Sequence, residues 1–203
     1  MTEAKIRLSQ KEMELVSSGE LILTKNAILQ KANHLLSSLQ EKQLQYLEYF
    51  AAQYSDIMFH SSAKISKGEN YKGLPYLILD YPRVFEQEHI LAIRTMFWWG
   101  NFFSITLHLS GKYKIEKEEK LINAFTELIE KGYYLNINED PWEHHFEADN
   151  YIPVAGISDV EFENSIRKNN FIKLANKIDL YQWEDAEEIL LGSFKRLITL
   201  LNE

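Results

Sequence analysis

Residues 140–150, with the sequence DPWEHHFEADN, place two adjacent histidines among four carboxylates. Imidazole nitrogens and carboxylate oxygens are ligands that zinc, manganese and iron accept in proteins. The order Asp-Pro-x-Glu is typical of a helix start with Asp140 as the N-cap, and it predicts a short helix over 141–148. Trp142 and Phe146 share one face of that helix, and we expect this face to be buried.

The same predicted helix carries Glu143, His144 and Glu147 within one arc, while His145 points to one side. These three side chains supply enough nitrogen and oxygen ligands to begin a metal site. Two other interpretations stay open, namely an acid-rich surface helix and a helix that lines a pocket without metal. We favour the acid-rich surface helix, because the arc that carries the three side chains is the one expected to face solvent.

A second candidate site lies on a predicted hairpin, with strands over 90–99 and 102–110 joined by Gly100-Asn101. A two-residue loop of this kind pairs Trp99 with Phe102, and side chains then alternate between two faces. The first face is expected to carry Ala92, Arg94, Met96 and Trp98 with Phe103, Ile105, Leu107 and Leu109. The second face is expected to carry Ile93, Thr95, Phe97 and Trp99 with Phe102, Ser104, Thr106 and His108.

The first hairpin face is the better candidate for the main core, because its side chains are apolar except for Arg94, its single charge. The second face changes from aromatic to polar along the strands, and we expect Trp99 and Phe102 to contact a second subunit or line a ligand cleft. The alternatives are an intramolecular core for the aromatic cluster and a half-exposed sheet face for Thr106 and His108. A Ser–His nucleophilic pair also needs an orienting group and an oxyanion hole, and the sequence offers neither.

Arg94 is a charge within an apolar strand, and a buried arginine needs a partner. Asp80, at the end of the preceding predicted strand, is the partner we expect in a structural salt bridge. Arg94 at an edge with its head in solvent is a second interpretation. An anionic ligand that binds Arg94 is the third.

Helix starts are indicated by Ser-x-x-Glu capping boxes. We assign three such boxes to predicted helix starts, formed by Ser9 and Glu12, by Ser38 and Glu41, and by Ser158 and Glu161. Apolar spacing predicts helical segments over 24–54, with two helices or one bent helix meeting near Ser38, over 115–132 and over about 180–201. Gly132 is the expected end of the middle one.

The remaining signals predict strands. Residues 74–82 form an apolar run bracketed by prolines, which favours an edge strand or a strand with tight ends. Residues 171–178 fit a helix or a strand, and we favour the strand because Asn169-Asn170 precede it. The order of elements predicts one α+β domain over 1–203, helical over 1–54 and mixed over 60–203. Its sheet is expected to be mainly antiparallel, with helices packed on it and a helix at the C-terminus.

Composition limits the chemistry. The 203-residue chain has no cysteine, which excludes disulfides, thiolate nucleophiles and cysteine-ligated metals. Its net charge of −8 is local, because residues 139–163 hold eight acids and no lysine or arginine, which leaves 22 acidic and 22 basic residues elsewhere. This acidic stretch favours a cation or a basic protein partner, and the lack of a basic patch argues against nucleic acid.

We see neither a signal peptide nor a membrane-spanning run, so we expect a soluble cytoplasmic protein without membrane contact. The function we predict is a non-catalytic module that binds a protein or a small ligand, with a homodimer through the aromatic hairpin as one form. The expected ligand-binding residues are Arg94, Trp99, Phe102, Thr106 and His108. The alternative is a small metal-dependent hydrolase, or another enzyme, that uses the Glu143, His144 and Glu147 cluster or His108; no cofactor is indicated.

Overall fold

The computed structural model describes residues 6–49 and 61–202, which form helices and one antiparallel sheet of seven strands. This confirms the predicted α+β class. The strand order is β1-β2-β3-β4-β7-β5-β6. The strands are β1 (Lys64–Tyr71), β2 (Leu74–Phe85), β3 (Ile90–Trp98), β4 (Phe102–Ser110), β5 (Tyr134–Asn136), β6 (Tyr151–Pro153) and β7 (Phe171–Asp179).

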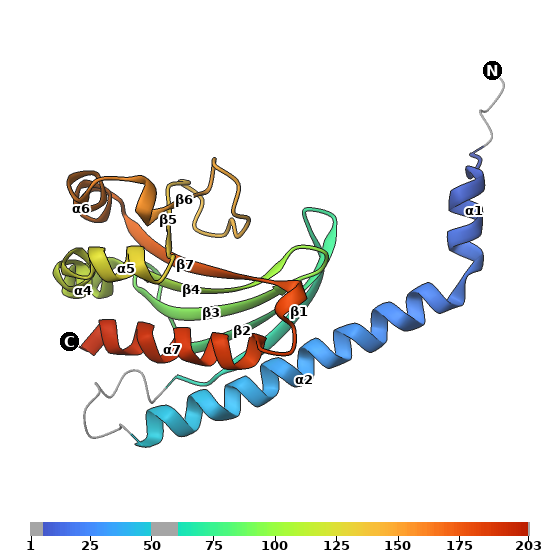
Figure 1. Cartoon of the computed structure of the whole chain (residues 1–203), viewed down its shortest axis with the longest axis horizontal. Helices are drawn as coiled ribbons and strands as arrows, with labels where there is room; N and C mark the ends of the chain where they lie inside the picture. The colour runs from blue at the N-terminus through green and yellow to red at the C-terminus, as the bar shows by residue number, and fades with distance from the viewer. Residues whose placement is uncertain (1–5, 50–60, 203) are drawn as a thin grey trace.

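Helices precede, interrupt and follow the strands, and Figure 1 shows their arrangement around the sheet. They are α1 (Gln10–Ser17), α2 (Gly19–Tyr49), α4 (Gly111–Asn123), α5 (Phe125–Glu130), α6 (Asp159–Lys168) and α7 (Ala186–Asn202), with short 3-10 turns η1 (Val154–Gly156) and η2 (Leu180–Gln182). The capping boxes at Ser9 and Ser158 start α1 and α6 as predicted. The predicted strand over 171–178 is confirmed as β7.

Helix α2 continues through Ser38 without interruption, so the expectation of two helices meeting there is wrong and the alternative of one helix is the one observed. The Ser38 hydroxyl does not cap a helix but donates to Glu187 of the C-terminal region at 2.7 Å. One stripe of α2 packs on the domain, because Ala32, Leu36 and Leu39 are fully buried. The part of the predicted segment over 50–54 lies outside the described residues.

The β3–β4 hairpin has a three-residue loop instead of the predicted two-residue loop. Trp98 pairs with Phe102, so Trp99 joins Gly100 and Asn101 in the loop. Gly100 has a φ of 71°, a left-handed conformation that glycine adopts at little cost and that three-residue hairpin loops commonly use. The predicted pairing of Trp99 with Phe102 is therefore wrong by one residue.

This register exchanges the faces of β4 relative to β3, because side chains alternate along a strand. Arg94 lies opposite Thr106, and His108 lies on the same face. The predicted core face combined Arg94 with Ile105 and Leu107, and that combination is wrong. The face that packs into the main core instead carries Ile93 and Phe97 of β3 with Phe103, Ile105, Leu107 and Leu109 of β4.

The two faces of the sheet have different covers. Helices α2 and α7 pack on the face that carries the main core, where Phe194 and Leu197 of α7 are fully buried. The segment between β5 and β6, which we call the 137–150 loop, lies on the other side of the sheet from these helices (Figure 1). That opposite face holds the polar side chains described below.

The 137–150 loop has no helix, so the helix predicted over 141–148 is wrong. Asp140 caps a turn instead, because its carboxylate accepts a hydrogen bond from the backbone amide of Trp142 at 2.8 Å. Trp142 is 49% exposed and not buried as expected. Phe146 is partly buried and stacks on Tyr151, with ring centroids 4.6 Å apart.

Candidate functional site

A polar cluster lies between the sheet and the 137–150 loop. Strands β2, β3, β4 and β7 contribute side chains to it. Residues that pair across neighbouring strands point to the same face of the sheet, so side chains from all four strands meet there. We define the basic cluster as Arg94, His108, His144 and Lys173, which line one small cavity together with Phe85, Ala92, Thr106 and Pro141. Four side chains with nitrogen at their ends therefore meet in one place, from strands β3, β4 and β7 and from the 137–150 loop.

Arg94 forms a bidentate salt bridge with Asp80 of the neighbouring strand β2. Its Nε donates to Oδ1 of Asp80 at 2.8 Å, and its Nη2 donates to Oδ2 at 3.0 Å. This confirms the predicted Arg94–Asp80 pair. The remaining Nη1 lies 3.1 Å from Nε2 of His144. Because a guanidinium only donates, His144 accepts here, and its neutral ring carries the proton on Nδ1.

Lys173 is the most deeply buried charge-bearing group of the cluster, with 1% of its surface exposed. Its Nζ donates to the backbone oxygen of Glu143 at 2.5 Å and lies 5.3 Å from the centre of the Tyr151 ring. Burial, and after it the nearby guanidinium of Arg94, lowers the pKa of Lys173 to about 7. Lys173 therefore changes its charge near neutral pH, where an ordinary lysine stays protonated.

His108 is held between aromatic rings, with Trp142 and Phe171 at centroid distances of 5.9 Å and 5.7 Å. Burial, with the charges of Lys173 and Arg94, lowers the pKa of His108 to about 3. The ring is therefore neutral at physiological pH. Its Nε2 is buried and has no hydrogen-bond partner among the described residues. Nearly all buried polar atoms in proteins have such a partner, and the lack of one is destabilising.

Tyr71, at the end of β1, fixes the 137–150 loop over the cluster. The backbone amides of His144 and His145 both donate to its hydroxyl, at 2.7 Å and 3.0 Å. That hydroxyl in turn donates to Oε2 of Glu143 at 2.8 Å. Burial is the main cause that raises the pKa of Tyr71 to about 12, so it keeps its proton and its role as a donor.

His145 is buried behind this tyrosine and links two carboxylates. Its Nδ1 lies 2.8 Å from Oε2 of Glu143, and its Nε2 lies 3.1 Å from Oδ1 of Asp149. The hydrogen bond from Tyr71, with the charges of Lys72 and His145, lowers the pKa of Glu143. The hydrogen bond from His145 likewise lowers the pKa of Asp149.

The predicted metal ligands do not meet. His144 contacts Arg94, Glu143 binds Tyr71, and Glu147 is exposed. Over residues 6–49 and 61–202, no three histidine, aspartate or glutamate side chains are close enough together to hold a metal ion. His144, predicted to face solvent, instead points at the sheet, and burial holds its pKa well below the usual value.

The predicted ligand-binding residues lie in three places. Arg94, Thr106 and His108 line the same cavity. Phe102 lies near the hairpin loop on the same face, where it contacts Trp98 and Phe146. Trp99 is partly buried against the opposite face and its main core, so it does not join the cluster.

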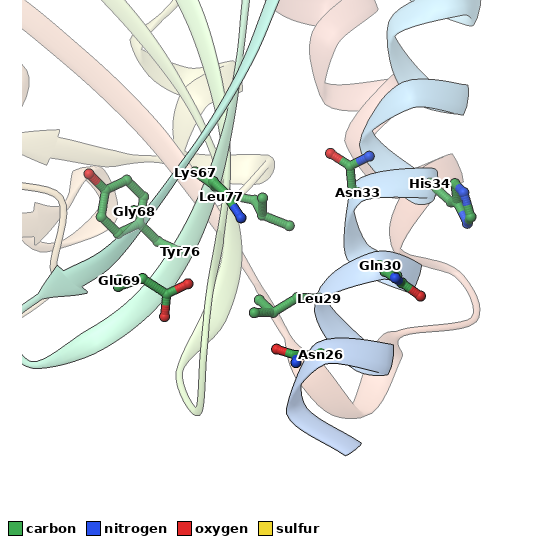
Figure 2. Close-up of a pocket in the computed structure, with 10 residues that line it drawn as sticks. All are labelled: Asn26, Leu29, Gln30, Asn33, His34, Lys67, Gly68, Glu69, Tyr76 and Leu77. Carbon is green, nitrogen blue, oxygen red and sulfur yellow. The ribbon is translucent and has the colours of Figure 1, made fainter. Parts of the chain in front are cut away.

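A wider groove lies between α2 and the outer strands of the sheet. It has a volume of about 660 Å³ and is lined by Asn26, Leu29, Gln30, Asn33, His34, Lys67, Gly68, Glu69, Tyr76 and Leu77. Leu29 of α2 and Leu77 of β2 approach each other across it (Figure 2). Amides and apolar groups dominate this groove, and it lacks the convergent buried charges of the basic cluster.

Sequence reasoning missed Lys173 and Tyr71. A signal existed for Lys173, because it interrupts the apolar run FIKLANKI between Ile172 and Leu174, as Arg94 interrupts its own strand. Applying to Lys173 the argument made for Arg94 would have identified a buried cation. Tyr71 carries no such signal, because its role depends on where a distant loop folds.

Comparison of the chain with family models, with curated proteins and with solved structures gives no match. In the part of the chain that the structure describes, no helix combines the length and the apolar character needed to cross a membrane. The geometry of the basic cluster is therefore the basis for a functional proposal.

Proposed function

We propose that the chain is a binding module for a small oxyanion, such as a carboxylate or a phosphate group, held by Arg94, His108 and Lys173 under the 137–150 loop. One observation carries this proposal: the buried Lys173, the partly buried Arg94 and the unpartnered Nε2 of His108 converge on a single small cavity. An oxyanion accepts hydrogen bonds from all three groups and compensates the buried positive charge of Lys173.

The charges of the cluster favour an anion over a cation. Arg94 and Asp80 neutralise each other, while Lys173 donates to the neutral backbone oxygen of Glu143. Protonated Lys173 therefore adds a positive charge that this carbonyl does not balance. Thr106, opposite Arg94 on β4, supplies a hydroxyl donor within the same cavity wall.

Entry of an oxyanion requires movement of the 137–150 loop. The cavity has a volume of about 10 Å³, which is the space that one water molecule needs. Two of the contacts that hold the loop closed come from the cluster itself, because Lys173 binds the backbone of Glu143 and Arg94 binds His144. An oxyanion can replace the Glu143 backbone oxygen and His144 as hydrogen-bond acceptors. Ligand binding and loop opening are therefore coupled, because the ligand takes over the donors that held the loop.

Calorimetric titration with sulfate and with formate tests the proposal, because both keep their charge between pH 6 and pH 9. We expect saturable binding that weakens as the pH rises above about 7, the pKa of Lys173 in the free protein. Lys173→Met removes the charge and should abolish binding. Lys177→Met, on the same strand and face but exposed, is the matched control and should leave binding unchanged.

Two results would overturn the proposal. One is the absence of binding by every small oxyanion tried, with a thermal midpoint that stays constant as the anion concentration rises. The other is equal binding by the wild type and Lys173→Met, which would place the anion elsewhere on the surface. A folding check by near-ultraviolet circular dichroism separates a loss of binding from a loss of structure.

A further inference from the structure

The N-terminal arm, which we define as residues 6–24, extends away from the domain into solvent. It comprises α1 and the first turns of α2, and Figure 1 shows it projecting beyond the edge of the sheet. Every residue of the arm is exposed. Eight of its exposed side chains are large and apolar, namely Ile6, Leu8, Met13, Leu15, Val16, Leu21, Ile22 and Leu23. Monomeric proteins rarely leave so many apolar side chains together in solvent.

The sequence of the arm nevertheless encodes a helix start. The Ser9 hydroxyl accepts the backbone amide of Glu12, and the Glu12 carboxylate accepts the backbone amide of Ser9 at 2.7 Å. A helix of eight residues is too short to persist in water by its intrinsic propensity. Because α1 has no buried residue in this chain, its stability has to come from packing on another surface.

The charges of the arm indicate what that surface is. The bases Arg7 and Lys11 precede the acids Glu12, Glu14 and Glu20, so positive charge gathers at one end and negative charge at the other. An antiparallel pairing of two identical arms places the basic end of each beside the acidic end of the other. Such a two-fold contact is self-complementary, as a contact between two copies of one chain must be.

We propose that the chain forms a two-fold dimer in which α1 of each copy packs on α1 of its partner, with the exposed start of α2 at each end of the contact. The pairing is antiparallel and is centred near Met13, so that Arg7 approaches Glu20 of the second copy at both ends. The aromatic hairpin is a poorer contact between copies, because Trp99 and Phe102, the residues expected at that contact, are already partly buried against core clusters of one chain. The dimer is independent of the oxyanion site.

Light scattering coupled to size-exclusion chromatography tests the dimer over a range of protein concentrations. We expect a mass near twice the chain mass of 23.9 kDa, falling toward one chain on dilution. Val16→Asp should weaken association by at least about tenfold, because it places a charge in an apolar contact. Val160→Asp is the matched control: Val16 is 69% exposed and Val160 on α6 is 61% exposed, but only Val16 lies in the arm.

Charge exchange tests the antiparallel geometry. Arg7→Glu alone and Glu20→Arg alone should each weaken association, because each puts like charges together at both ends of the pair. The double variant should restore it. Failure of the double variant to recover, with both single variants folded and dissociated, would overturn the antiparallel arrangement.

Covalent capture gives a further measurement, because it reports which residues meet at the contact. The natural chain has no cysteine, so Met13→Cys places one thiol at the expected two-fold centre. Mild oxidation should convert it to a disulfide-linked dimer, while Tyr181→Cys, fully exposed and outside the arm, should give much less. A wild-type chain that is monomeric at every concentration, together with equal capture of the two cysteine variants, would overturn the proposal.

Discussion

Both faces of the sheet are buried, but one buries apolar side chains and the other buries polar side chains. On the helix-covered face, Phe103, Ile105 and Leu107 of β4 are fully buried and contact other apolar side chains. On the loop-covered face, the alternate residues of the same strand are Ser104, Thr106 and His108, and they are also buried. One strand therefore carries an apolar core on one side and a polar interior on the other.

The difference follows from what each cover brings with it. A helix satisfies its own backbone groups, so only its side chains need partners in the core. An irregular loop brings unpaired backbone amides and carbonyls, and each needs a hydrogen bond when it is buried. Tyr71 and Lys173 supply such bonds to the 137–150 loop. A loop cover thus requires polar side chains beneath it, and these become available for binding.

The largest effect should come from the helix-covered face. Phe103→Ala removes a fully buried ring from contact with Phe97 and Trp183 and should cost about 3–5 kcal/mol of unfolding free energy. Phe102→Ala is the matched neighbour, only partly buried on the loop-covered face, and should cost less. Urea titrations of both variants give the comparison. A greater loss for Phe102→Ala would mean that the loop-covered face carries more of the stability.

The second effect is a pH dependence from Lys173. Its folded pKa of about 7 lies below the usual lysine value of 10.5, so between these values the unfolded chain holds a proton that the folded chain does not. Stability should therefore rise with pH through this window, by at most about 1.4 kcal/mol per pH unit. Below about pH 7 both states are protonated and the full cost of burying the charge is present.

Lys173→Met isolates this contribution. Urea titrations at pH 7, 8 and 9, in chloride buffers free of oxyanions, should show the rise in the wild type and a flatter profile in the variant. Lys177→Met, which changes an exposed lysine of the same strand, should keep the rise. Parallel profiles for the wild type and Lys173→Met would show that Lys173 titrates in the folded protein as it does in the unfolded chain.

Local signals in the sequence predicted most of the elements, because the physics of a capping box or an apolar stripe is contained within a few residues. The boxes at Ser9 and Ser158 start helices, and the run FIKLANKI is strand β7. The same kind of signal at Ser38 failed, because the Ser38 hydroxyl binds a glutamate 149 positions away. A capping box predicts a helix start only when long-range packing does not continue the helix through it.

The candidate site was predicted only in part, because its assembly depends on register and on a loop. Arg94 and Asp80 could be paired from the sequence, since they lie on neighbouring strands. Placing Arg94 beside His108 required the length of the hairpin loop, and an error of one residue moved His108 to the opposite face. The turn at Asp140 has the residues of a helix start, but the helix does not continue because the backbone of His144 and His145 binds Tyr71 instead.

The smallest effect concerns two glutamates of the 137–150 loop, and it tests whether the loop is held by particular contacts or by its acidity. Glu143→Lys should cost about 1–2 kcal/mol, because the partly buried Tyr71 hydroxyl and the buried His145 lose their acceptor. Glu147→Lys makes the same change of charge four residues later at an exposed position and should stay within about 0.5 kcal/mol of the wild type. Urea titration at one pH measures both. Equal losses would mean that net negative charge, and not the Tyr71 network, holds the loop. A loss confined to Glu143→Lys would show that the loop cover depends on the hydrogen bonds that its irregular backbone requires.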